Sequence, residues 1–157
     1  MSSPPAGAHA PRWPLILLRT TATSLALLGV LQAMLAGSFL NGNYESLQAH
    51  EGTAMMLATV VLVQLAVAVP VRWVGRGPLW PLWGSTLLAV AVTLQISFGY
   101  ERALGVHVTL GVLLVSGILF GLVGAWRLPL PVKGGATSAA DGGGRLPRPG
   151  GPVEVVK

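Results

Sequence analysis

Four long apolar runs, separated by short polar segments, dominate the chain. Each run is long enough to cross the hydrocarbon core of a bilayer, which requires about 20 apolar residues in a helix. A lipid-exposed span must satisfy its own backbone hydrogen bonds, so each run is predicted to be helical. Short connections make neighbouring helices antiparallel, and the predicted fold class is therefore all-α, a four-helix transmembrane bundle. The predicted spans cover about residues 14–40, 50–72, 79–100 and 103–126.

The two ends of the chain differ in composition from the apolar runs. Residues 1–13 are rich in Pro and Ala and are predicted to form a disordered N-terminal segment. Residues 128–157 hold many Gly and Pro and are predicted to be a disordered tail, because such a segment cannot bury a core. The first span is predicted to be uncleaved, since its apolar run is too long for a signal peptide and contains Arg19. Arg19 lies near the start of the span, where its side chain can reach the membrane interface.

Composition supports a membrane protein. Hydrophobic residues make up 52% of the chain and charged residues only 10%, whereas soluble domains carry about 25% charged residues. The absence of cysteine excludes disulfides and cysteine-ligated iron–sulfur clusters. Eight arginines against two lysines, with abundant Ala, Gly and Pro, are typical of a GC-rich bacterial genome. The net charge of +5 does not indicate a nucleic-acid partner, because the basic residues flank apolar runs and no basic stripe carries interleaved aromatic residues.

The basic residues also predict an orientation. All but Arg102 fall on one side of a four-span topology, and Lys and Arg favour the cytoplasmic side of a membrane. The predicted location is therefore the bacterial plasma membrane, with several spans and with both termini and the 72–77 loop in the cytoplasm. The residues on that side are Arg12, Arg19, Arg72, Arg76, Arg127, Lys133, Arg145, Arg148 and Lys157.

A short pattern occurs twice along the chain. LQAMLAG is followed by YESLQAH, and LQISFG is followed by YERALGVH. In each copy a glutamine near the end of one span, Gln32 or Gln95, precedes a Tyr-Glu pair and then a histidine, His50 or His107, that begins the next span. The chain is therefore predicted to be a duplicated helical hairpin, with the copies related by an axis along the bilayer normal. This symmetry brings the two histidines to equal depth near the outer face.

Small side chains follow each histidine on the same helix face. A residue four positions after a helical residue shares its face, and these positions are Ala and Gly. The sequence thus predicts a space between the second and fourth helices, beside two imidazoles. A flat haem b suits such a space, and six-coordinate bis-histidine iron suits electron transfer more than oxygen binding. The predicted haem-binding residues are His50, His107, Gln32, Gln95, Ala54 and Gly111; the two histidines bind the iron, and the glutamines hydrogen-bond the haem edge or the imidazoles.

Glycines in the fourth span predict close helix packing. Gly117 and Gly121 form a GxxxG step, and Gly111 and Gly124 lie nearby. Small residues at this spacing allow the backbones of two membrane helices to approach. This face of the fourth span is therefore predicted to pack closely against another helix.

Two other functions remain open. A cofactor-free structural or accessory subunit explains the low charge equally well, but does not require paired histidines. A small transporter is less favoured, because only Gln64 and Thr93 bring polar groups near mid-span. The chain carries no motif of a soluble enzyme and is more consistent with a protein that is not an enzyme by itself. The expected partners are the lipid bilayer and either a membrane redox partner or further copies of the chain.

The repeated Gln–Gly–His pattern is similar to one half of heme A synthase, and still more similar to small, uncharacterised four-span bacterial membrane proteins. The resemblance covers about residues 20–127. It implies a four-helix bundle in which His50 and His107 bind haem. Leu47 and Glu51 stand where the synthase pattern has Glu and Arg, and only one half is present. The resemblance therefore implies haem binding more than the synthase reaction.

Overall fold

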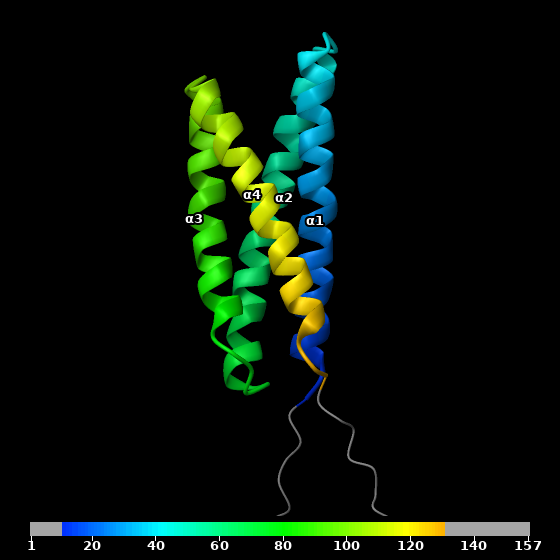
Figure 1. Ribbon diagram of the computed structural model, residues 1–157, viewed down its shortest axis with the longest axis vertical. Helices are drawn as coiled ribbons and strands as arrows, with labels where there is room; N and C mark the ends of the chain where they lie inside the picture. Colours follow the sequence, from blue (N-terminus) through cyan, green and yellow to red (C-terminus); the bar gives the residue numbers. More distant parts are fainter. Residues whose placement is uncertain (1–10, 131–157) are drawn as a thin grey trace, which may run out of the picture.

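A computed structural model describes residues 11–130 of the chain, and this part contains four α-helices and no strand (Figure 1). The helices are α1 (Trp13–Leu40), α2 (Glu45–Trp73), α3 (Trp80–Tyr100) and α4 (Leu104–Arg127). Four helices and no strand in residues 11–130 confirm the predicted all-α fold. All four helices are also long and apolar enough to cross a membrane. The predictions of disorder concern segments that lie largely outside the described residues, at 1–10 and 131–157.

Local sequence explains where several of these helices begin. Pro14 and Pro81 occupy the first or second position of α1 and α3, where a missing N–H leaves no helical hydrogen bond unmade. Helix α2 begins at Glu45, before the start of the predicted span, because the turn after α1 is very short. Gly42 makes that turn with a φ of 93°, a backbone conformation that glycine adopts easily. His50 consequently lies in the second turn of α2.

The helices form an antiparallel bundle in chain order. Helix α1 packs against α2 and α4, and helix α3 packs against the same two helices. Helices α2 and α4 lie diagonally opposite each other, and their backbones make no close approach within the described residues. The start of α1 and the end of α4 lie at the same end of the bundle (Figure 1). We call this the Arg19 end, and the opposite end, which carries the 41–44 and 101–103 turns, the histidine end.

Helix α4 crosses the bundle obliquely. Figure 1 shows it beside α3 at the histidine end and beside α1 at the Arg19 end. Two cavities accompany this crossing. The histidine cavity, lined by residues that include His50 and His107, lies toward the histidine end, and the Gln64 cavity, lined by residues that include Gln64 and Trp80, lies toward the Arg19 end. Leu114 of α4 borders both cavities.

A layer of buried apolar side chains lies between the two cavities. It draws on all four helices, so it holds the two hairpins together at mid-height, where close van der Waals packing stabilises the association of helices in lipid. A second apolar cluster fills the Arg19 end. The buried side chains of the middle layer are Leu25, Ala26, Leu57, Val61, Val92 and Ile118.

Arg19 joins α1 to the end of α4. Its guanidinium donates hydrogen bonds to the carbonyl oxygens of Ala125 (3.3 Å), Trp126 (3.2 Å) and Leu128 (2.6 Å). It also lies over the Trp126 ring, 5.0 Å from the centroid. The last carbonyls of a helix have no intrahelical partner, and a cation there also complements the helix dipole. Arg19 therefore caps α4 from a neighbouring helix rather than only extending to the membrane interface.

The prediction that Gly117 and Gly121 mediate close packing is wrong. A Cβ added at either position would meet nothing within 4 Å among the described residues, because both glycines line the Gln64 cavity. The Trp80 side chain of α3 contacts α4 one turn further on. A Cβ at Gly124 would lie 2.8 Å from Cη2 of Trp80. The aromatic side chain of α3, and not a second helix backbone, occupies the space that glycine leaves.

Candidate functional site

The histidine cavity has a volume of about 480 Å³ and receives side chains from all four helices. This volume is within the range of small-molecule sites, about 300–1,000 Å³. Exposed lining residues such as Gly37 of α1 and Val112 of α4 show that the cavity opens between these two helices. All six residues predicted to bind haem line it: Gln32, His50, Ala54, Gln95, His107 and Gly111.

The two imidazoles face the same cavity from diagonally opposite helices. Their ring centroids are 6.3 Å apart, and the ring planes are inclined by 64°. A metal–imidazole nitrogen bond is about 2.0 Å long, and bond lengths within the ring place each nitrogen about 1.2 Å from its centroid. Two imidazoles on opposite sides of one metal ion therefore have centroids about 6 Å apart. The 6.3 Å separation of His50 and His107 is close to this spacing, and it also lies in the range of an edge contact between two rings.

The tautomer of His107 follows from its hydrogen bonds. Nδ1 lies 2.9 Å from the backbone oxygen of Gln95. A carbonyl oxygen only accepts, so Nδ1 carries the proton and Nε2 of the neutral ring carries the lone pair. The side-chain amide of Gln95 donates to that lone pair over 3.3 Å. A backbone carbonyl bound to one ring nitrogen is the usual means by which proteins orient an imidazole that ligates a metal through the other.

Two glycines make room for this arrangement. A Cβ at Gly99 would lie 3.0 Å from Cε1 and 3.2 Å from Nδ1 of His107. A Cβ at Gly111 would lie 3.0 Å from the amide nitrogen of Gln95. Gly99 was not among the predicted site residues, although it is the glycine of the second repeat copy. Its counterpart, Gly37, has nothing within 4 Å of an added Cβ and instead borders the open side of the cavity.

His50 is held differently. The Gln32 amide donates to the backbone oxygen of His50 (2.9 Å) and to Oγ1 of Thr53 (3.0 Å), not to the imidazole. The backbone of Gln32 lies near the His50 ring, but Nδ1 is buried and makes no hydrogen bond. An unpaired buried polar group costs about 1–3 kcal/mol. The His50 ring is therefore less firmly oriented than the His107 ring.

The donor set is limited to these two imidazoles. Within residues 11–130, no group of three or more His, Cys, Asp or Glu side chains is arranged to hold a bare metal ion. Two neutral imidazoles are nevertheless a complete protein contribution to haem iron, because the porphyrin supplies the other ligands. The residues present therefore fit haem better than a zinc or copper ion, which takes more of its ligands from the protein.

The Tyr-Glu pairs of the two repeat copies have different surroundings. The Tyr100 hydroxyl donates to Oε1 of Glu51 over 2.6 Å and so joins α3 to α2 at the histidine end. Tyr44 instead packs its ring edgewise on Phe39, with centroids 5.9 Å apart. The Tyr100–Glu51 bond closes the α2–α3 side of the bundle, whereas the α1–α4 side opens to the histidine cavity. Glu51 has no counterpart in the second copy, so the repeat did not indicate its role.

The candidate site is thus a pair of imidazoles in an apolar cavity, one of them oriented by a backbone carbonyl and the other with a buried nitrogen left without a hydrogen bond. Comparisons of the chain with protein family models, with curated proteins and with solved structures found no match.

Proposed function

We propose that this membrane protein binds b-type haem between His50 and His107 and serves electron transfer or haem handling. The observation that carries the proposal is the separation of 6.3 Å between the two imidazole centroids across one cavity. At this spacing the two imidazoles would hold a single haem iron between them. Haem held in this way would supply reversible one-electron chemistry between ferric and ferrous iron.

The residues of this chain would have distinct roles. His107 would bind through Nε2, because its Nδ1 proton is engaged by the Gln95 carbonyl. The Gln95 amide would have to leave Nε2, and its own oxygen makes no hydrogen bond that would hold it in place. Ala54 and Gly111 carry little or no side chain and so leave space in the cavity beside the two rings. Apolar walls would exclude water and disfavour release of the cofactor.

The orientation that we propose places the histidine end outward in a bacterial plasma membrane. Arg12, Arg19, Arg72, Arg76 and Arg127 all belong to segments at the Arg19 end of the bundle, whereas Arg102 lies in the turn at the opposite end. Cytoplasmic segments carry the excess of basic residues in membrane proteins. A redox or haem-handling partner would therefore approach the site from the outer side.

The proposed activity is haem binding, not haem A synthesis. The similarity to one half of heme A synthase supports the two ligands. Leu47 and Glu51 depart from the synthase pattern, and Glu51 is engaged by Tyr100. With one bundle and one histidine pair in the described residues, the protein is proposed to hold a single haem and not to be an enzyme by itself.

A spectroscopic experiment tests the proposal. The protein is expressed in a haem-replete host and purified in a mild detergent, and oxidised and reduced absorption spectra are recorded. We expect the spectrum of low-spin, six-coordinate haem, and we expect His50→Ala and His107→Ala each to abolish the low-spin form. His9→Ala, at the remaining histidine of the chain, is the matched control and should leave the spectrum unchanged.

Two results would contradict the proposal. A colourless preparation that stays colourless after haem addition would favour the cofactor-free structural subunit. Low-spin haem that persists in both single variants would place the ligands elsewhere. Thermal unfolding of each variant in detergent separates loss of the ligand from loss of the fold.

A further inference from the structure

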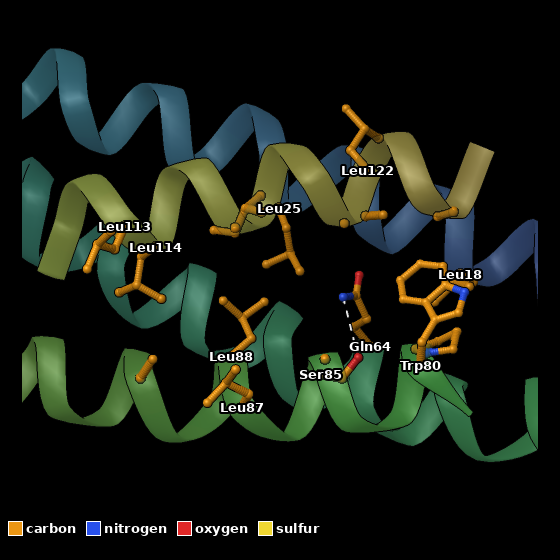
Figure 2. A pocket seen from close by; sticks show the side chains of 18 of the residues that line it. Leu18, Leu25, Gln64, Trp80, Ser85, Leu87, Leu88, Leu113, Leu114 and Leu122 are labelled. Carbon is orange, nitrogen blue, oxygen red and sulfur yellow. Dashed lines mark hydrogen bonds between the residues drawn. The ribbon is translucent and has the colours of Figure 1, made fainter. Parts of the chain in front are cut away.

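The Gln64 cavity lies in the half of the bundle that the proposed haem site leaves unused. It has a volume of about 350 Å³ and is walled mainly by leucines, alanines and glycines of α1, α3 and α4, whereas α2 contributes Gln64 (Figure 2). Exposed lining residues on α3 and α4, Leu87 and Leu113, show that it opens sideways between these helices. In a membrane this opening faces lipid, so a ligand would enter from the bilayer and not from water.

One polar group stands in this apolar cavity without a full set of partners. Figure 2 shows the Gln64 side chain extending into the space between α3 and α4. Its amide nitrogen lies 3.5 Å from the hydroxyl oxygen of Ser85, which is 2% exposed, and its Oε1 is buried with no hydrogen bond. The 3.5 Å contact is at the outer limit of a hydrogen bond. Gln64 is therefore under-satisfied at a depth where no bulk water reaches.

One atom of the Gln64 amide lacks a partner whichever way the amide is turned. If nitrogen faces Ser85, the oxygen needs a donor; if the amide is reversed, the nitrogen needs an acceptor. A ligand that can offer either a hydroxyl or a carbonyl satisfies both cases. Trp80 adds an aromatic wall beside Gln64, against which a flat ring can pack.

We propose that the Gln64 cavity binds the ring of a membrane-dissolved quinone or quinol. The ring oxygen hydrogen-bonds Gln64, the ring packs beside Trp80, and the alkyl tail leaves through the opening between Leu87 and Leu113. A quinone presents a carbonyl and a quinol a hydroxyl, so either redox form can pair with the amide. This site is separate from the histidine cavity, from which the buried layer that includes Leu25 and Ile118 divides it.

Equilibrium binding tests this inference. Full-length protein in nanodiscs is titrated with radiolabelled decyl-benzoquinone, with empty nanodiscs subtracted. Gln64→Leu removes the amide while keeping an apolar side chain, and we expect affinity to fall roughly 2- to 10-fold, as one hydrogen bond predicts. Gly117→Leu places a side chain in open cavity space and is expected to lower affinity at least about tenfold. Gly105→Leu, on α4 but outside the cavity, is the control and should bind as wild type.

A matched probe identifies the occupant. Decylbenzene has the same tail and ring without oxygen, and we expect it to bind more weakly than the benzoquinone to wild type and about equally to Gln64→Leu. Equal binding of both probes to wild type would mean that the cavity holds only apolar chains and would overturn the inference. Unchanged quinone binding in Gly117→Leu would also overturn it, by placing the bound quinone elsewhere. The haem spectrum of each variant is an independent readout, because none of the substituted residues touches the histidines.

Discussion

Replacing Arg19 with methionine removes a charged side chain that joins α1 to the end of α4. Arg19 donates to carbonyl oxygens of the last turn of α4 and of its C-cap residue, Leu128, and lies over the Trp126 ring. Methionine keeps an unbranched apolar stem but offers no donor. The substitution therefore tests whether the Arg19 end is held by this cap or by apolar packing alone.

The structure sets the expected size of the effect. A hydrogen bond to a charged group contributes about 1.5–3 kcal/mol net, and the short bond to Leu128 O, at 2.6 Å, belongs in this class. The bonds to Ala125 and Trp126 are longer, at 3.3 and 3.2 Å, and add less. The cation–π contact contributes about 0.5–1 kcal/mol at a partly exposed position. We therefore expect Arg19→Met to lower the free energy of unfolding by about 2–4 kcal/mol.

Unfolding in mixed micelles of a mild and a denaturing detergent, followed by tryptophan fluorescence, measures this loss. Arg72→Met is the control, because Arg72 makes one bond of 3.4 Å to the Gly77 oxygen and should lose less than about 1 kcal/mol. Arg19→Lys keeps the charge but not the planar fork, and should recover only part of the loss. If Arg19→Lys has the same free energy of unfolding as the wild type, the Arg19 side chain acts only as an interfacial charge. Equal losses in Arg19→Met and Arg72→Met would refute the cap as well.

Two further predictions concern glycines that accommodate a neighbouring ring. In Gly99→Ala the new Cβ would displace the His107 imidazole from the Gln95 carbonyl, so haem affinity should fall about 10- to 100-fold by titration, the usual effect of losing a ligand's orienting partner; unchanged affinity would mean that this orientation is unimportant. In Gly124→Ala the new Cβ would press on Trp80, whereas Gly121→Ala meets open space, so thermal unfolding in detergent should show Gly124→Ala less stable by about 1–3 kcal/mol. Both variants gain the same helix propensity, so equal stability would show that the Trp80 ring moves aside freely.

The two halves of the histidine site are similar in sequence but not in structure. Gln95 contacts the His107 ring through both its amide and its backbone oxygen, whereas the Gln32 amide contacts the backbone of His50 and only the Gln32 backbone lies near the His50 ring. His107 is therefore oriented before any ligand binds, and His50 has a buried nitrogen that remains to be satisfied. If haem binds as proposed, His107 would be the better-oriented ligand, and His50 would reorganise more on binding.

Sequence alone was sufficient for the number and type of elements. Four apolar runs of membrane-spanning length force helices, because a backbone in lipid must satisfy its own hydrogen bonds. Short polar connections then force an antiparallel order, and the duplicated Gln–Tyr-Glu–His pattern brings His50 and His107 to the same end. These conclusions depend only on the length and polarity of each segment and on the order of the segments along the chain, all of which can be read from the sequence.

The tertiary structure decided what the small and polar residues of these helices do. Gly117 and Gly121 have the spacing of a packing motif, yet they border a cavity, because the oblique path of α4 separates them from α3, and at Gly124 only the long Trp80 side chain reaches α4. The same crossing angle leaves Gln64 under-satisfied in the second cavity. A helix angle depends on side-chain packing over the whole interface, so no single stretch of sequence specifies it.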